Sequence, residues 1–141
     1  MFTINIEFLG QQPPRAPYSR MSLDEIYGYL LWEADLTVTY NNQILFSERV
    51  AIVEFYWYLV NWYRRYLTGN AVQFVYSTVE HTKPILVFSP QQNQYWKIDS
   101  VWKQCDKLAL IKEEILLSEV YKLLEKIMVE IEHKTGDGSL S

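Results

Sequence analysis

The sequence of 141 residues contains a single cysteine, Cys105, so no intrachain disulfide can form. One thiol in a chain of this size favours a reducing compartment, and we expect a cytoplasmic protein. A basic segment followed by an apolar run is also missing at the start, where MFTINIEFLG alternates in polarity like a strand. We therefore expect no signal peptide.

Basic residues are too few and too scattered to bind nucleic acid. Thirteen Lys and Arg stand against 17 Asp and Glu, and Arg64-Arg65 is the only adjacent basic pair. Binding to phosphates needs clustered cations, so we expect no nucleic-acid partner. Residues 1–50 hold six acids and three bases, residues 51–105 three and five, and residues 106–141 eight and five. This surplus of acids favours a basic protein partner.

The motifs of common active sites are missing as well. The sequence contains no Gly-rich phosphate loop, GxSxG, HExxH or CxxC motif, and no EF-hand loop. His81, His133 and Cys105 are widely separated, which matches neither a metal site nor a Cys–His nucleophile. We expect no catalytic residue, no metal and no cofactor, and hence a protein that is not an enzyme.

Aromatic residues, in contrast, make up 16% of the chain, and many lie in the apolar stretch from Val50 to Leu67. At helical spacing this stretch has two adjacent apolar stripes, Ile52, Phe55, Leu59, Trp62 and Tyr66, then Val53, Tyr56, Val60, Tyr63 and Leu67. An apolar face of this width predicts a central helix packed against a sheet. Glu54, Asn61 and Arg64-Arg65 interrupt the stretch, so we do not expect it to span a membrane.

Alternating polarity predicts strands on both sides of the central helix. The predicted strands are Phe2–Phe8, Leu36–Tyr40, Gln43–Phe46, Val72–Tyr76, Pro84–Phe88 and Gln94–Ser100, with Leu108–Ile111 as a further candidate. Asn41-Asn42 indicates a tight hairpin turn, because Asn tolerates the left-handed conformation. Gly69 is a natural cap for the end of the central helix.

Two further helices complete the predicted α+β fold. Ser22 and Glu25 match a capping box for a short helix that ends near Trp32-Glu33. Ser118 can cap a final helix that reaches about Lys134. Short links favour antiparallel neighbours, so we expect a mainly antiparallel sheet of about six strands. Residues 1–135 are predicted to form one domain, followed by a disordered tail over residues 136–141.

Two groups of residues are candidates for partner binding. The first is the narrow third stripe of the central helix, which consists of Glu54, Trp57, Tyr58, Asn61 and Arg65. Trp, Tyr and Arg dominate interface energies, so this stripe is either a binding face or the side where the helix meets water or the last helix. The second group is the carboxylate pair Glu33 and Asp35, which either steers a partner or is a solvated edge.

The segment from Leu36 to Trp102 resembles small bacterial proteins that are encoded beside polymorphic toxins. The shared features are a hairpin, LTVTYNNQILFSE, an apolar Trp-containing helix, IVEFYWYLVNWYRRY, and a late strand, YWKIDSVW. The resemblance implies an immunity-type protein that binds and blocks a cognate toxin. These motifs are structural and assign no functional residue.

Three hypotheses for the function remain. The first is a non-enzymatic inhibitor or adaptor, such as an immunity protein, which fits the missing motifs, the acidity and the aromatic surplus. The second is a small-ligand-binding domain, or an enzyme whose residues are dispersed along the chain. The third is a self-associating structural protein, for which a homodimer with a large two-fold interface is expected.

Overall fold

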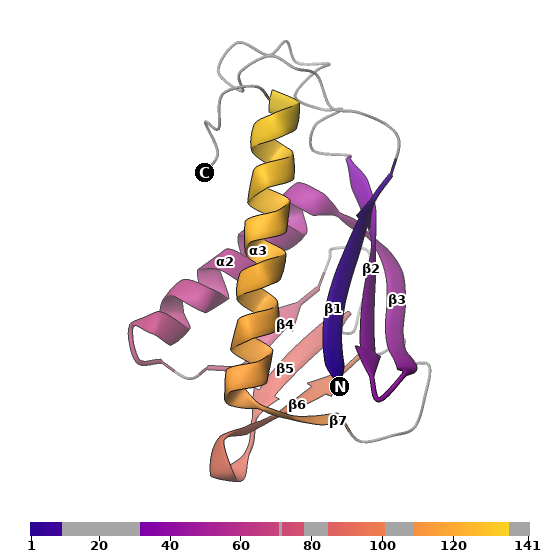
Figure 1. Ribbon diagram of the computed structural model, residues 1–141. Helices are drawn as coiled ribbons and strands as arrows, with labels where there is room; N and C mark the ends of the chain where they lie inside the picture. Colours follow the sequence, from indigo (N-terminus) through magenta and orange to yellow (C-terminus); the bar gives the residue numbers. More distant parts are fainter. Residues whose placement is uncertain (10–31, 71, 78–84, 101–108, 136–141) are drawn as a thin grey trace.

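The computed structural model describes residues 1–9, 32–70, 72–77, 85–100 and 109–135, and begins with a three-stranded antiparallel sheet (Figure 1). Its strands are β1 (Phe2–Phe8), β2 (Glu33–Tyr40) and β3 (Gln43–Ala51). Asn41 and Asn42 join β2 to β3 with φ angles of 50° and 64°, which confirms the predicted turn. Alternate residues such as Ile6, Leu36 and Val50 are buried, so one face of this sheet lines the core.

Four further strands form a second antiparallel sheet. They are β4 (Phe74–Tyr76), β5 (Leu86–Pro90), β6 (Tyr95–Asp99) and β7 (Ala109–Lys112), which lie side by side in sequence order. The α+β class with antiparallel strands is confirmed, but the seven described strands divide between two sheets and do not share one. The division occurs where β3 ends at Ala51 and a helix begins at Ile52, which takes the chain out of the first sheet.

This central helix, α2, spans Ile52–Leu67, so it begins two residues later than predicted. Its buried residues are Ile52, Val53, Phe55, Leu59 and Trp62, and four of these, all except Val53, confirm the first apolar stripe as far as Trp62. The second stripe is buried only in part, and Leu67, the last helical residue, is 64% exposed. Gly69 follows with φ of 97°, the left-handed conformation expected of the cap.

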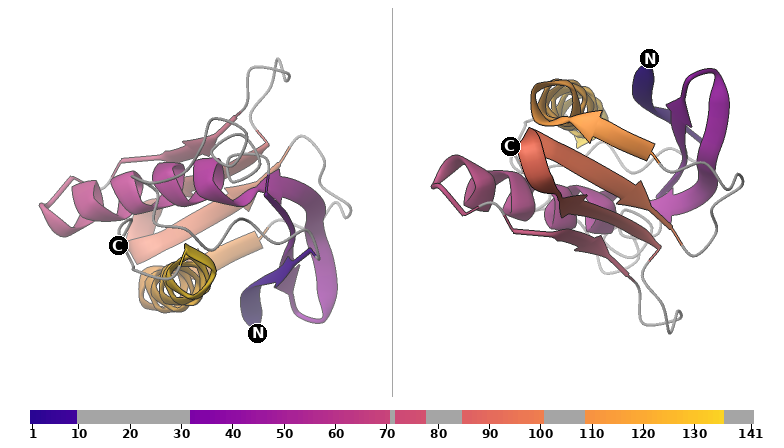
Figure 2. Two further views of the ribbon diagram at one scale, coloured as in Figure 1. Left: turned by 90° about the horizontal axis from the view of Figure 1, so that it is seen from above. Right: turned by 90° about the horizontal axis from the view of Figure 1, so that it is seen from below.

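The last helix, α3, spans Glu113–Thr135 and packs against both sheets, at β1 and at β6 and β7 (Figure 2). It begins at Glu113 and not at Ser118, because Glu113 and Glu114 occupy the first turn, where carboxylates interact favourably with the helix dipole. Its buried face consists of Leu116, Val120, Leu123, Leu124, Ile127 and Ile131. Lys126 Nζ donates to the Ile6 carbonyl at 2.8 Å, so this helix also covers the outer edge of β1.

Several predictions concern residues outside the described ranges. The predicted helix from Ser22, the predicted tail over residues 136–141, and the side chains of His81 and Cys105 all lie there. Trp32 and Glu33, near which that helix was predicted to end, are described: Trp32 is a buried residue before β2, and Glu33 is the first residue of that strand. In the described ranges, no helix has the length and apolar character needed to cross a membrane.

Candidate functional site

An open groove lies between the outer face of α2 and strand β4. Its volume is about 400 Å³, and we call it the α2–β4 groove. Its lining residues are Trp57, Tyr58, Asn61, Trp62, Arg65, Gln73, Phe74 and Val75. The structure thus brings four predicted partner-binding residues of α2 into one groove. The side chains of Trp57 and Tyr58 remain 52% and 41% exposed, so α3 leaves this stripe uncovered.

Trp62 connects the two walls of the groove. Its indole Nε1–H donates to the Val72 carbonyl at 2.7 Å, which holds the segment before β4 against the helix. Its ring meets those of Phe74, Phe88 and Trp96 edge to face, at centroid distances of 5.8, 5.9 and 5.5 Å. Edge-to-face pairs add to the free energy of burial, so the floor of the groove is anchored in the core.

Glu54, the first member of the predicted stripe, borders the groove through Tyr76. The Tyr76 hydroxyl donates to Glu54 Oε1 at 3.1 Å, and the Tyr58 ring meets the Tyr76 ring edge to face at 5.2 Å. Burial, and after it the Glu54 carboxylate, raises the pKa of Tyr76 above its usual value of 10.0. Tyr76 therefore stays a neutral donor around neutral pH, and Glu54 supports the groove wall without lining it.

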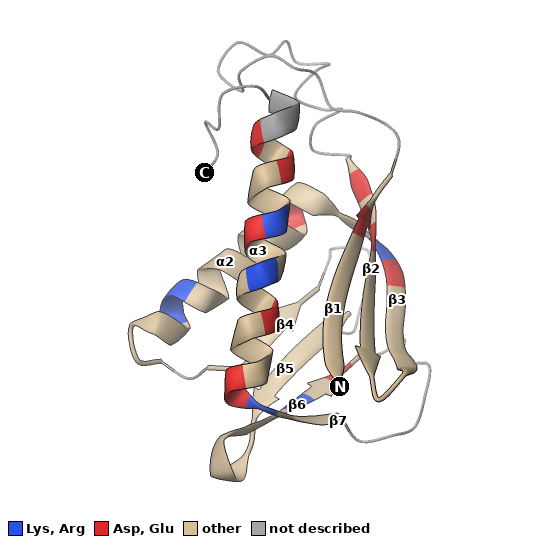
Figure 3. Ribbon diagram, viewed as in Figure 1, with Lys and Arg blue, Asp and Glu red and all other residues tan. Residues whose placement is uncertain are grey.

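The groove carries its positive charge at one end, at Arg65. Among the described residues that line it, Arg65 is the only charged one, and Arg64 stands beside it in the last turn of α2 (Figure 3). Cations are favoured at this end of a helix by the helix dipole. No ion pair between described residues involves Arg65. A guanidinium can bind a carboxylate group through two parallel hydrogen bonds.

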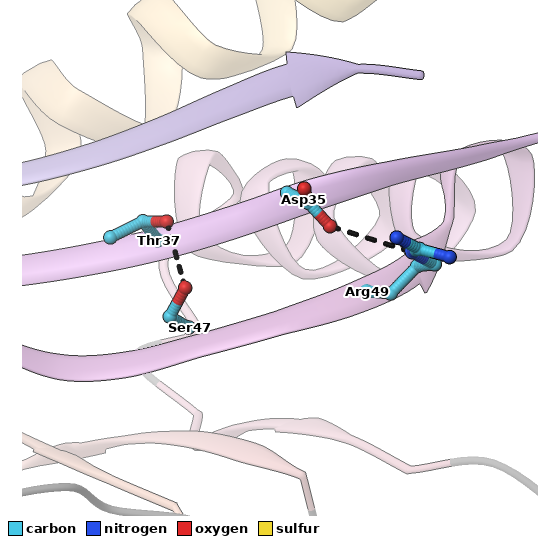
Figure 4. A network of polar contacts seen from close by, with 4 residues as sticks. All are labelled: Asp35, Thr37, Ser47 and Arg49. Carbon is cyan, nitrogen blue, oxygen red and sulfur yellow. Dashed lines mark hydrogen bonds and ion pairs between the residues drawn. The ribbon is translucent and has the colours of Figure 1, made fainter. Parts of the chain in front are cut away.

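Glu33 and Asp35 lie on β2 and are not part of the α2–β4 groove. The Asp35 carboxylate pairs with Arg49 Nε on β3 at 3.5 Å, and the Thr37 and Ser47 hydroxyls form a hydrogen bond of 3.2 Å beside this pair (Figure 4). The Asp35 and Arg49 side chains are 43% and 58% exposed, so their ion pair contributes little to stability. The two predicted groups of binding residues therefore do not combine in one site.

Three lining residues, Gln73, Phe74 and Val75, are functional candidates that the sequence did not reveal. The alternating polarity of this segment predicted a strand, and it contained no motif that indicates binding. Which helix face lies beside this strand depends on the order of strands in the sheet. That order is set by contacts between residues far apart in the sequence, and a local pattern does not contain it.

A second hollow, of about 460 Å³, lies where the turn between β5 and β6 meets the start of α3. Its lining residues are Asn93, Gln94, Tyr95, Lys112, Glu113, Glu114 and Leu117. Trp96 Nε1 donates to Glu113 at 3.2 Å, so this carboxylate is held by the core. The described residues contain no group of three or more His, Cys, Asp and Glu side chains that could hold a metal ion.

The fold and the groove together define a class of protein. It is an α+β domain with two antiparallel sheets and an aromatic-rich helix, one side of which is exposed to solvent. The chain belongs to the family described as Domain of unknown function (DUF7878), whose family model matches residues 7–133. No curated protein and no solved structure matches the chain. The matched range includes both walls of the α2–β4 groove.

Proposed function

We propose that this chain is a non-enzymatic protein-binding module, an immunity-type inhibitor of a cognate toxin, and that the α2–β4 groove is its contact surface. The observation that carries the proposal is the exposure of Trp57 and Tyr58, at 52% and 41%, beside Arg65 in an open groove. These residue types supply most of the binding energy at protein interfaces. Covering them would remove apolar surface from water, which is favourable.

Two features of the sequence support the same proposal. The resemblance of residues 36–102 to proteins encoded beside toxins points to an inhibitor, and the single cysteine is consistent with a cytoplasmic location. The net charge of −4 favours a partner that is basic overall. In this proposal Glu33 and Asp35 attract the partner from a distance, and the groove holds it.

The test is a binding titration of the whole chain against the product of the gene immediately upstream. Trp57→Ala should weaken binding by about 2 kcal/mol or more, the cost expected of an interface anchor. Tyr121→Ala is the matched control, because Tyr121 is an aromatic residue on α3 that is 55% exposed and lies outside the groove. Equal loss in both variants, or no binding at micromolar concentration, would contradict the proposal.

A small-ligand-binding function is the second candidate. The volume of the α2–β4 groove, about 400 Å³, lies within the range of roughly 300–1,000 Å³ that is usual for small-molecule sites. A small ligand would raise the melting temperature of the isolated chain, and Trp57→Ala would abolish this rise. Such a result, together with no binding to the upstream product, would favour the ligand-binding function over the inhibitor.

A further inference from the structure

Strand β4 ends the second sheet, and no described strand pairs with its outer edge. It pairs with β5 alone, from Phe74 opposite Phe88 to Tyr76 opposite Leu86. The outer edge of such a strand presents unpaired N–H and C=O groups that can accept another extended chain.

The outer edge of β1 differs in this respect. There Lys126 Nζ donates to the Ile6 carbonyl at 2.8 Å and to Asn5 Oδ1 at 3.5 Å, so a lysine from α3 occupies the edge. Lysines of this kind prevent a further strand from adding to a sheet. In the described part of the chain, no lysine makes such a contact with β4.

The α2–β4 groove gives access to the backbone of β4. Side chains of consecutive strand residues point to opposite faces, and accordingly Phe74 is buried whereas Val75 is 37% exposed. A groove that is lined by Gln73, Phe74 and Val75 together therefore runs along the strand edge. The Tyr76 carbonyl accepts from Ile85 N–H at 2.8 Å, on the side of β5. Because the ladder alternates, the N–H and C=O of Val75 face outward.

We propose that the α2–β4 groove binds an extended segment of the partner protein, which adds to β4 as a further strand. The segment places an acidic side chain at Arg65 and an apolar side chain on Trp57. This inference rests on the proposed protein-binding function and specifies how the partner is held. Main-chain hydrogen bonds to Val75 provide affinity, and alternate side chains of the segment provide specificity.

Charge complementarity selects the acidic residue of this segment. Arg65 is the only charged residue in the described lining of the groove, and its planar guanidinium matches a carboxylate with two parallel hydrogen bonds. Only the one side chain of the segment that meets Arg65 must be acidic, so the partner as a whole can still be basic. Glu54, which lies on α2 as Arg65 does, is already held by the Tyr76 hydroxyl, and it is not part of the lining.

The test uses a displayed library of random linear peptides of about ten residues, selected for binding to the whole chain and against binding to its Trp57→Ala variant. The recovered peptides should carry Asp or Glu in an otherwise apolar, alternating sequence. Arg65→Glu should weaken a recovered peptide by about tenfold or more, and replacing the acid of the peptide by Lys should restore its affinity for that variant. Arg64→Glu is the matched control, because Arg64 is adjacent but does not line the groove.

Methylation of peptide nitrogens then tests strand addition itself. A methyl group on alternate backbone nitrogens of a recovered peptide should abolish binding, whereas the same group on the intervening nitrogens should be tolerated. Hydrogen exchange at the Val75 amide should also slow when the peptide is bound. Tolerance of methylation at every position would overturn strand addition, and so would the recovery of no acidic peptides. If the upstream product still binds and Trp57→Ala still weakens it, then protein binding stands and only this mode is refuted.

Discussion

At the scale of single residues, position on α2 separates the aromatic side chains into core and surface. Trp62 is 4% exposed and joins the core cluster, whereas Trp57 is 52% exposed. The two positions are about 140° apart around a helix of 3.6 residues per turn, so Trp62 points toward the core, at the floor of the groove, and Trp57 points toward solvent at its rim. The same residue type thus stabilises the domain at one position and offers a binding anchor at the other.

Tyr76 leads to a prediction about pH. Because burial raises its pKa, the native state holds the hydroxyl proton more tightly than the unfolded chain does. The stabilisation from this group is complete below the usual pKa of 10.0 and is lost as the pH rises from there toward the raised native pKa. The free energy of unfolding should therefore fall more steeply above this pH in the wild type than in Tyr76→Phe.

Urea titrations at neutral pH and on both sides of the usual tyrosine pKa would measure this difference. At neutral pH the Tyr76→Phe variant should be about 1 kcal/mol less stable, since it loses the hydrogen bond to Glu54. Tyr121→Phe, at an exposed position on α3, is the control for loss of a tyrosine hydroxyl. Parallel pH profiles of the wild type and Tyr76→Phe would contradict the expectation.

At the scale of elements, α2 is stabilised by one buried face and leaves the other for binding. The buried face reaches from Ile52 to Trp62, and the exposed face carries Trp57, Asn61 and Arg65. This division of a single helix predicts that stability and binding can be altered separately. Substitutions on the buried face should destabilise the domain, and those on the exposed face should change affinity alone.

A pair of leucine substitutions tests the buried face. Leu59 is 0% exposed, so Leu59→Ala should reduce the free energy of unfolding by about 2–5 kcal/mol. Leu67 belongs to the same helix but is 64% exposed, and Leu67→Ala should change stability by less than about 0.5 kcal/mol. Chemical denaturation of both variants gives the comparison. A cost for Leu59→Ala as small as that for Leu67→Ala would refute the central position of α2.

At the scale of the whole molecule, the acidic residues and the exposed aromatic residues of α2 lie in different places. Acidic residues lie at one end of β2 and, with lysines between them, along α3, whereas Arg64 and Arg65 lie in the last turn of α2 (Figure 3). Charges at the rim of an interface act mainly on the association rate, and aromatic anchors act mainly on dissociation. The separation of the two therefore predicts separate kinetic effects.

Glu33→Lys combined with Asp35→Lys tests the steering effect of the acids. The double variant should associate with the upstream product more slowly than the wild type at low salt and nearly normally at high salt, because salt screens exposed charges. Trp57→Ala should dissociate faster at both salt concentrations. Surface plasmon resonance at two salt concentrations measures both rates. A salt-independent effect of the double variant would exclude steering by these two acids.

Much of the local structure was predictable because it depends on neighbours in the sequence. The Asn41-Asn42 turn, the cap at Gly69 and the buried stripe of α2 follow from backbone preference and from periodicity, and the structure confirms all three. The exposed stripe with Trp57, Tyr58 and Arg65 was predictable for the same reason. The start of α3 was placed too late, because Ser118 was preferred as a cap over the acidic first turn at Glu113.

What only the tertiary structure decided is how these elements meet. The sequence predicted one sheet, and its strands divide between two, because strand pairing depends on contacts between residues that are distant along the chain. The same contacts leave β4 at an edge beside the outer face of α2, which creates the groove and adds Gln73, Phe74 and Val75 to the candidate site. They also place Glu33 and Asp35 on another sheet. The sequence by itself thus determined which residues lie on which side of each helix and strand. Long-range packing decided that α2 and β4 lie side by side and line one groove.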